Sequence, residues 1–436
     1  MIPFIFKKTD SDDPDVVKGY ELTYSYAMRL CGLYPDLKDF RYYIFGFQQN
    51  CIHVAYLWFV VAYMISTYLA FTHNDIELLS YELCYGLLTL IFFLVAHNIM
   101  YRRHQLDSLF RMVGKGFFTY EKPIGGKEQA VVDDCDKRCK KTVRRNLLLS
   151  LVLTVLICVV PPLPHAFKGE YTSVVNGGVP VNKHLALPVW SPYPIDTPVT
   201  FWTMYTIELL AGNVESFILG ANCTLFCNLC IIISRELKLL RIALKNTKSR
   251  AIYTFRMRGH SIPRGQRYEK SEIFQQCMVQ CIEECIQHHV ALKKFNNAIQ
   301  DMMGFPIFAI FSGTALTIST PMFMLLTMSR AQNNPLLVLK IIQHCYIIFC
   351  FTFFLSAYCL FGQIITNESS SIHFAFYETP WPEANLDFRR KVIMGMIHSR
   401  KPFVLTAKGF ASASSATLID ILKTIFSYFN LLAATQ

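Results

Sequence analysis

Long runs of apolar residues, separated by polar and charged segments, dominate the pattern of this chain. A helix needs about 20 mostly apolar residues to cross a bilayer, and seven runs reach that length. They lie at residues 51–71, 78–100, 147–166, 199–234, 303–328, 336–366 and 403–434. The fourth and sixth runs exceed what one crossing needs, so we expect these helices to tilt or to continue beyond the membrane. The pattern predicts an all-α membrane protein with seven transmembrane helices.

Positively charged residues indicate the orientation of these helices. The segments before the first run and after the second, fourth and sixth runs contain 36 Lys and Arg residues. The other segments between runs contain three, Lys168, Lys183 and Arg330. Cytoplasmic loops retain Lys and Arg near the ends of spans. We therefore expect a cytoplasmic N-terminus and an extracellular C-terminus, which is opposite to the orientation of a G-protein-coupled receptor.

Composition narrows the functional classes. Of the 436 residues, 17% are charged, against roughly a quarter in soluble domains. The net charge is +11, and the positively charged residues lie beside the apolar runs. No basic tract contains interleaved aromatic residues, so we expect no nucleic acid partner. The chain contains no Walker loop, Ser-x-x-Lys or His-Glu-x-x-His motif. We therefore do not expect an enzyme.

A stripe of cysteines permits two interpretations. Cys277, Cys281 and Cys285 recur every four residues and are followed by His288 and His289. Cysteine and histidine are the residues that hold zinc, so a metal site is one interpretation. The stripe also describes the small apolar face of a packed amphipathic helix. We favour packing and expect neither a metal nor a cofactor.

Polar residues inside the fourth run form a second stripe. Glu208, Glu215 and Asn222 repeat every seven residues, which places them on one face of a helix. Ionisable groups at membrane depth usually face a bundle interior or a water-filled cavity. This face could line a path for a ligand or an ion, or it could form a hydrogen-bonded seam between helices. Ion-coupled transport is an alternative function, although no inverted repeat is visible in the sequence.

Aromatic residues in several runs suggest a binding pocket. One stripe lies in the outer half of the second run, and further aromatic residues lie in the fourth and sixth runs. Together they would line a concave apolar pocket that opens outward, although such stripes also occur in plain helix packing or at a membrane interface. The expected ligand-binding residues are Tyr81, Tyr85, Phe92, Phe201, Tyr205, Glu208 and Tyr346.

Several short motifs lie in the C-terminal third of the chain. They are Ala375-Phe376-Tyr377 with Trp381, Phe388-Arg389-Arg390, residues 401–407 (KPFVLTA), Leu422-Lys423-Thr424, Ser427-Tyr428-Phe429 and Leu431-Leu432. In this region the chain resembles the insect odorant receptor family, seven-helix channels with an intracellular N-terminus. The chain length and the long fourth run also match that family. The first two thirds match it in layout more than in motif.

Two related groups differ from this chain near its end. Gustatory receptors typically follow Thr-Tyr with five apolar residues and then Gln-Phe, whereas here Ser427-Tyr428 is followed at that position by Ala434-Thr435. The coreceptor of the odorant receptors carries a longer second inner loop and a terminus rich in Val, Leu and Gln. We therefore favour a ligand-tuning subunit, with a gustatory-type receptor channel as the alternative.

The resemblance implies a mechanism and a location. A receptor of this kind binds a small hydrophobic odorant or pheromone and opens a non-selective cation channel together with the coreceptor, in the plasma membrane of a sensory neuron dendrite. Four subunits would surround one pore lined by the seventh helix. Leu431 would then lie at a hydrophobic constriction that gates by dewetting. The implied pore and gate residues are Tyr428, Leu431, Leu432 and Ala434.

The resemblance also divides the chain into four parts. Residues 1–50 would form a cytoplasmic N-terminal segment, and residues 51–234 would form helices one to four with the ligand pocket in their outer half. Residues 235–302 would form a cytoplasmic anchor, whose Lys and Arg also contact anionic membrane lipid. Residues 303–436 would form helices five to seven, including the pore-lining last helix.

Overall fold

The computed structural model describes residues 13–25, 28, 33–34, 40–121, 126–162, 168–169, 171, 181–182, 184–261, 267–328 and 337–434. Within these ranges the regular structure is helical, apart from two isolated β-bridges. The main helices are α1 (Pro14–Leu22), α3 (Phe40–Thr72), α4 (Ile76–Tyr101), α5 (Arg103–Lys115), α6 (Glu128–Thr154), α8 (Pro198–Lys245), α9 (Thr247–Met257), α10 (Glu272–Met328), α11 (Leu337–Tyr377), α12 (Leu386–Ser399) and α13 (Ser415–Ala434). The protein is an all-α membrane protein, as the sequence predicted.

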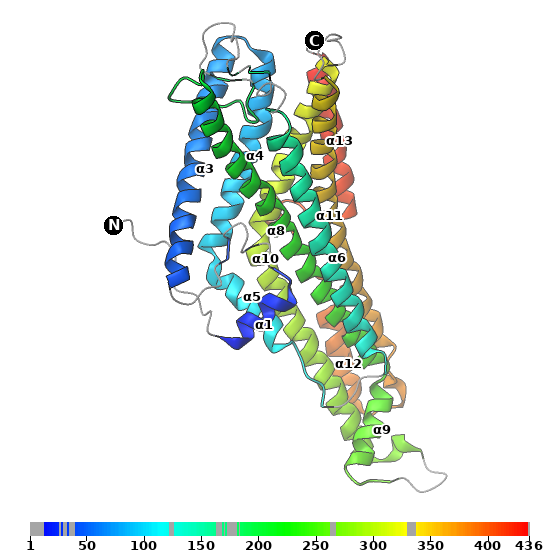
Figure 1. Cartoon of the computed structure of the whole chain (residues 1–436). Coiled ribbons are helices and arrows are strands. Elements are labelled where there is room, and N and C mark those ends of the chain that lie inside the picture. Colours follow the sequence, from blue (N-terminus) through cyan, green and yellow to red (C-terminus); the bar gives the residue numbers. More distant parts are fainter. Residues whose placement is uncertain are drawn as a thin grey trace.

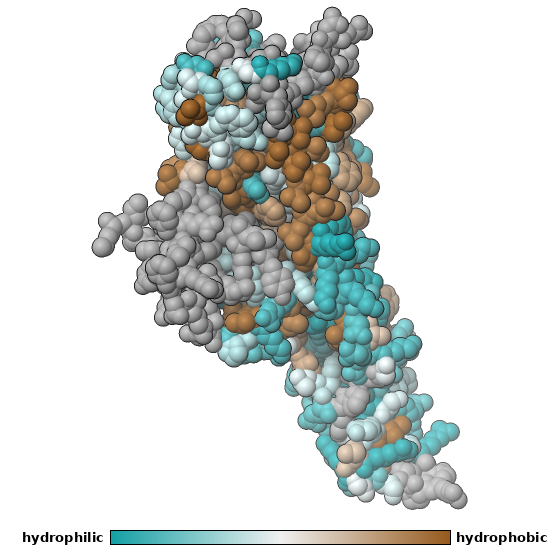
Figure 2. All heavy atoms as spheres, in the orientation of Figure 1, coloured by the Kyte–Doolittle hydropathy of each residue, from teal (hydrophilic) through white to brown (hydrophobic). Residues whose placement is uncertain are grey.

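Six helices among the described residues are long and apolar enough to cross a membrane. They overlap the first six predicted runs and span Val54–Thr72, Leu78–Tyr101, Glu128–Val159, Pro198–Lys245, Glu272–Leu326 and Val338–Glu383. Hydrophobic side chains form a broad band over the upper half of the molecule (Figure 2). The seventh run falls on α13, a helix of 20 residues that packs beside α10 and α11. That α13 crosses the membrane stays a prediction.

Three helices continue well beyond the length of a membrane span. α8, α10 and α11 contain 48, 57 and 41 residues. At 1.5 Å per residue α10 is about 85 Å long, against a hydrocarbon core of about 30 Å. The extra length predicted for the fourth and sixth helices is confirmed. The lower ends of α8 and α10 join α9 and α12 in a narrow extension (Figure 1).

The starts of α6 and α13 differ by several turns from the starts of the apolar runs that they overlap. The third run starts at residue 147, yet α6 begins at Glu128, because its first turns are polar and carry no apolar signal. The seventh run starts at residue 403, yet α13 begins at Ser415. The intervening residues form a turn in which the amide of Ala413 donates to the carbonyl of Leu405 (2.8 Å). Lys408 and Gly409 have positive φ in this turn, a conformation that a helix cannot contain.

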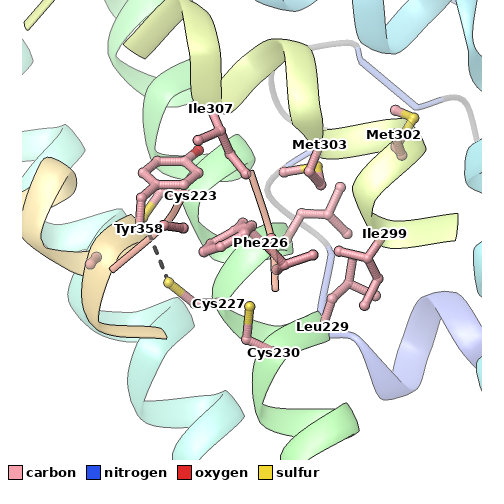
Figure 3. Close-up of a cluster of buried hydrophobic side chains, with 14 of the residues drawn as sticks. Cys223, Phe226, Cys227, Leu229, Cys230, Ile299, Met302, Met303, Ile307 and Tyr358 are labelled. Atoms are coloured by element: carbon pink, nitrogen blue, oxygen red, sulfur yellow. Dashed lines mark hydrogen bonds between the residues drawn. The ribbon is translucent and has the colours of Figure 1, made fainter. Parts of the chain in front are cut away.

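The central contact of the bundle lies between α8, α10 and α11. Phe226 of α8 packs against Tyr358 of α11 with ring centroids 4.7 Å apart, beside Met303 of α10 (Figure 3). Asn222 Nδ2 donates to the hydroxyl of Tyr358 (2.7 Å) in the same region. Asn222 therefore belongs to a hydrogen-bonded seam between helices, which is one of the two interpretations of the polar stripe.

α1 lies so close to α5 that glycine is required at the contact. A Cβ atom added at Gly114 of α5 would overlap the backbone carbonyl of Asp15, and one added at Gly19 of α1 would overlap that of Phe110. The same contact contains an ion pair between Arg111 Nε and Asp13 Oδ2 (2.6 Å). Backbone atoms cannot yield as a flexible side chain can, so the two helices must separate if a side chain is added.

We expect Gly114→Ala to destabilise the folded protein by about 2 kcal/mol, within the range for overpacked contacts. Thermal unfolding of the detergent-solubilised protein should show a lower Tm. Gly126→Ala is the matched control, because an added Cβ there meets no atom within 4 Å. Equal melting temperatures for Gly114→Ala and the unaltered protein would contradict this account of the α1–α5 contact.

Candidate functional site

The aromatic stripe of α4 begins with two stacked tyrosines. The rings of Tyr81 and Tyr85 have centroids 6.1 Å apart, and the Tyr81 ring also meets the ring of His344 from α11 at 5.9 Å. Gln343 Nε2 donates to the hydroxyl of Tyr85 (3.1 Å). Both tyrosines therefore join α4 to α11. The Tyr85 hydroxyl is buried and accepts this bond, so its own O–H is left to donate to a ligand.

Phe92 lies two helical turns further along the same face, at a small apolar cavity. The cavity has a volume of about 10 Å³, enough for one water-sized sphere. Its only polar lining residues are two threonines of α10, whose hydroxyls donate to backbone carbonyls of their own helix. The wall is therefore apolar. The cavity lies between α4, α8, α10 and α11 and is lined by Leu88, Ile91, Phe92, Leu219, Ile310, Thr314, Thr317, Phe351 and Phe354.

The predicted pocket residues of α8 lie together at the start of that helix. Phe201 and Tyr205 both contact the ring of Trp202, at centroid distances of 5.8 and 5.5 Å. Glu208 is fully buried, and its Oε2 accepts a hydrogen bond from the backbone amide of Leu187 (3.1 Å). Glu208 therefore bonds the segment that precedes α8, whereas the two aromatic residues pack against Trp202 of their own helix.

That preceding segment, residues 184–197, makes hydrogen bonds to two helices of the bundle. Its Trp190 amide donates to Ser66 Oγ of α3 (2.6 Å), and Trp190 also pairs with Val181 in a β-bridge. Leu187 is held by Glu208 of α8. The segment thus connects α3 to α8.

Buried carboxylates are a feature that the sequence analysis identified only in part. Glu82 of α4 is 1% exposed, and neither of its carboxylate oxygens has a hydrogen-bond partner among the described residues. One oxygen of Glu208 is also without a partner there. An ionised carboxylate without partners is costly in an apolar interior. Glu82 could have been found as the acidic residue inside the second apolar run.

Tyr346 lies apart from the other predicted pocket residues. It is half-buried on α11, and its hydroxyl donates to the backbone carbonyl of Leu149 on α6 (3.3 Å). The structure therefore divides the predicted ligand residues among the Tyr81–Tyr85 stack, the cavity at Phe92, the start of α8 and the α6–α11 contact. Their role as ligand contacts stays a prediction.

The predicted pore and gate residues lie on the last turns of α13. Tyr428 and Leu431 are 40% and 64% exposed, and Ala434 is exposed as well. Ile425, three residues before Tyr428, is 4% exposed and packs against the bundle. The side chain of Leu432 lies outside the described residues. An apolar face left open in one chain requires cover by lipid or by another subunit.

The cysteine stripe lies on the buried side of α10. Cys277, Cys281 and Cys285 are all buried free thiols, and Arg250 Nη1 donates to the sulfur of Cys285 (3.5 Å). His289 stacks on the ring of Phe403 with centroids 5.5 Å apart. Among the described residues, no group of three or more metal-binding side chains converges. The geometry agrees with packing of this face.

Ion pairs connect the elements of the predicted anchor. Lys248 of α9 lies 2.6 Å from Glu269 and 2.9 Å from Glu383, which follows α11. Hydrogen bonds to Glu269 and Glu383 raise the pKa of Lys248 above its usual range. Arg250 pairs with Glu284 of α10, and its guanidinium lies 4.6 Å from the centroid of the Tyr120 ring. The ends of these helices in the predicted anchor are therefore held together as a packed unit.

Comparison with known proteins identifies the family. The family described as 7tm Odorant receptor matches residues 75–426. Similar relatives include Odorant receptor 85c and Odorant receptor 2a of Drosophila melanogaster, 23% and 22% identical over 35% and 45% of this chain. The matches span 37% and 45% of those relatives' own length.

Solved structures with a similar fold include the insect olfactory receptor OR5 of Machilis hrabei. Its structure in complex with eugenol has a TM-score of 0.74 and 14% sequence identity, covering 97% of this chain and all of that chain. A second structure of the same receptor has a TM-score of 0.76, covering 96% and 99% of the two chains. The fold and the family match agree with the resemblance found in the C-terminal motifs. This chain belongs to the odorant receptor family.

Proposed function

We propose that this chain is the ligand-tuning subunit of an odorant-gated, non-selective cation channel. The apolar cavity at Phe92, enclosed by four helices, is the observation that carries the proposal. The Machilis receptor of similar fold was solved with eugenol, a small aromatic compound. An apolar site of this kind favours small hydrophobic volatiles through burial of apolar surface, at about 25 cal/mol per Å².

Binding must enlarge the cavity, because its volume of about 10 Å³ is far below the few hundred Å³ of a typical ligand site. Side chains and helices around it therefore move when a ligand enters. A ligand opens the channel only through its difference in affinity between the closed and open states. The state with the wider cavity is then the one that the odorant stabilises.

α11 connects the cavity to α13. Phe351 and Phe354 of α11 line the cavity. Further along the same helix, Gln363 Oε1 accepts a hydrogen bond from the amide of Ser415, the first residue of α13 (3.3 Å). Thr366 Oγ1 donates to the carbonyl of Phe403 in the preceding turn (3.1 Å). A displacement of α11 by the ligand would therefore shift the start of the proposed pore helix.

The proposed partner is the odorant coreceptor, in a heterotetramer in the plasma membrane of a sensory neuron dendrite. α13 leaves apolar residues exposed in the single chain. This supports the proposal that other subunits cover this face or that it lines a pore. The excess of Lys and Arg in alternate segments supports a cytoplasmic N-terminus.

Co-expression with the coreceptor tests this function. We expect odorant-evoked cation current from cells that express both subunits, and little current from cells that express this chain alone. By the family resemblance, the coreceptor carries a polar pore residue near the position of Ala434, which is apolar here. Whole-cell recording with an odorant panel measures the current, and cells with the coreceptor alone are the control. Robust current from this chain alone, unchanged by the coreceptor, would contradict a tuning-subunit role.

A further inference from the structure

A larger pocket lies away from the cavity, between α6, α8 and α11. Its volume is about 280 Å³, and it combines basic and apolar side chains. Three of its basic residues, Arg138, Lys141 and Arg145, recur along one face of α6. The pocket is lined by Val131, Asp134, Cys135, Arg138, Lys141, Thr142, Arg145, Cys230, Ile231, Ser234, Arg235, Lys238, Phe361 and Ile364.

The lining contains five basic residues and a single acidic one, Asp134. Arg138 pairs with this Asp134 at 2.8 Å. The other paired bases use carboxylates that do not line the pocket: Arg235 uses Glu236 at 2.6 Å, and Lys238 approaches Glu368 at 3.6 Å.

Lys141 and Arg145 have no acidic partner among the described residues. Arg145 lies with its guanidinium 4.7 Å from the centroid of the Phe353 ring. Its Nε donates to Asn146 Oδ1 (3.3 Å), whereas its Nη2 is buried and has no hydrogen-bond partner among the described residues. A buried guanidinium nitrogen without an acceptor is costly. The pocket therefore presents two positive charges, and one donor in it is unsatisfied.

The position of the pocket matches the inner boundary of the membrane. Arg145 is separated by one residue from the apolar half of α6, which starts at Leu147. Hydrophilic side chains begin along this side of the molecule directly below the hydrophobic band (Figure 2). Basic pockets between transmembrane helices on the cytoplasmic side suit the charged headgroups of anionic lipids.

We propose that this pocket binds the phosphorylated headgroup of an anionic membrane lipid. The phosphate accepts hydrogen bonds from Lys141 and from the unsatisfied nitrogen of Arg145, because phosphate offers several charged acceptor oxygens. The acyl chains then run along the apolar part of the lining, which includes Ile231, Phe361 and Ile364. A soluble phosphate compound shares the headgroup chemistry but gains nothing from this apolar wall.

The bound lipid would join three helices with different roles. α6 and α8 carry all five basic residues of the lining, and α11 contributes Phe361 and Ile364. Gln363, which bonds the start of α13, lies between those two positions on α11. A headgroup held here would restrain α11 near the point where it meets the proposed pore helix. The site is independent of the odorant-binding cavity, so its test does not depend on the proposed function.

Lipid binding to the purified full-length chain tests the proposal. The probes are dioctanoyl phosphatidylinositol 4,5-bisphosphate, dioctanoyl phosphatidylcholine and free inositol 1,4,5-trisphosphate, each titrated in detergent with microscale thermophoresis. We expect saturable binding of the anionic lipid and much weaker binding of the other two. The double variant Lys141→Gln/Arg145→Gln should weaken this binding at least about tenfold, since it removes two charged hydrogen bonds.

The matched control is Lys137→Gln/Arg144→Gln, which removes the same charge from the same helix at positions that do not line the pocket. It should retain the affinity of the unaltered chain. If the double variant does not fold, Lys141→Gln alone is tested instead. Lys141 is exposed and makes no described ion pair, so this single change should not disturb the fold. Equal weakening by both pairs, absence of saturable binding, or equal affinity for the free trisphosphate would each overturn the lipid site.

Discussion

Replacing Phe92 by alanine is expected to change odorant responses by about tenfold or more in potency. Burying an aromatic side chain is worth about 1.5–3 kcal/mol, and each 1.4 kcal/mol is a factor of about ten in affinity. Phe92 forms part of the wall of the cavity between α4, α8, α10 and α11. Small odorants should lose contact surface in the variant, so a higher concentration of them should be needed to evoke the same current. Larger odorants should gain room, so the order of the odorant panel should change.

Dose–response curves from cells that co-express the coreceptor measure this effect. Leu94→Ala is the matched control, since Leu94 lies on the same helix, does not line the cavity and is 40% exposed. It should leave both the potency and the order of the odorants unchanged. If Phe92→Ala reaches the cell surface and its curves coincide with those of Leu94→Ala, the cavity at Phe92 is not the odorant site.

The positions of the membrane-length helices could be predicted from the sequence because a bilayer imposes one strong physical requirement. Each span needs a long apolar run, and six such runs coincide with helices of the structure. The rule says nothing about the polar parts of a helix. The first turns of α6 and the first half of α10 are polar, so their true starts at Glu128 and Glu272 could not be predicted this way.

The seventh run shows the opposite error, since an apolar segment need not be helical. Residues 403–407 are apolar enough to extend the run, but they form part of a turn closed by the bond from Ala413 to Leu405. The side chain of Gln300 from α10 also bonds this turn. Its Nε2 donates to the carbonyl of Thr406, and its Oε1 accepts from the amide of Thr406. Such long-range partners leave no pattern at helical spacing.

The candidate pocket was only partly predictable for a related reason. Helical spacing shows that Tyr85 and Phe92 share a face of α4. It cannot show which residues of other helices meet that face, because this depends on crossing angles and helix rotation. Leu219, Ile310 and Phe351 line the cavity and give no distinct signal in the sequence. The close approach of α4 and α10, where Ile91 lies over Gly313, is set by the same packing.

Leu431→Ala is expected to raise the current that flows without odorant. Leu431 is 64% exposed near the end of α13, and the family motif places it at the proposed hydrophobic constriction. Narrow apolar constrictions block ions because water leaves them. A smaller side chain in this subunit would widen the ring, so water and ions would occupy the closed pore more often. The ranking of odorants by potency should stay the same, because Leu431 does not line the cavity.

Whole-cell recording with the coreceptor, before and during odorant application, separates gating from binding. Phe426→Ala is the matched control, because Phe426 is a similarly exposed apolar residue of α13, at 59%, one turn and a half before Leu431. Five residues of a helix rotate its side chain by about 140° away from the Leu431 face, so this variant should keep the basal current low. Increased basal current in both variants would indicate general loosening of α13. A changed odorant order in Leu431→Ala, with basal current unaltered, would place Leu431 in ligand recognition instead of the gate.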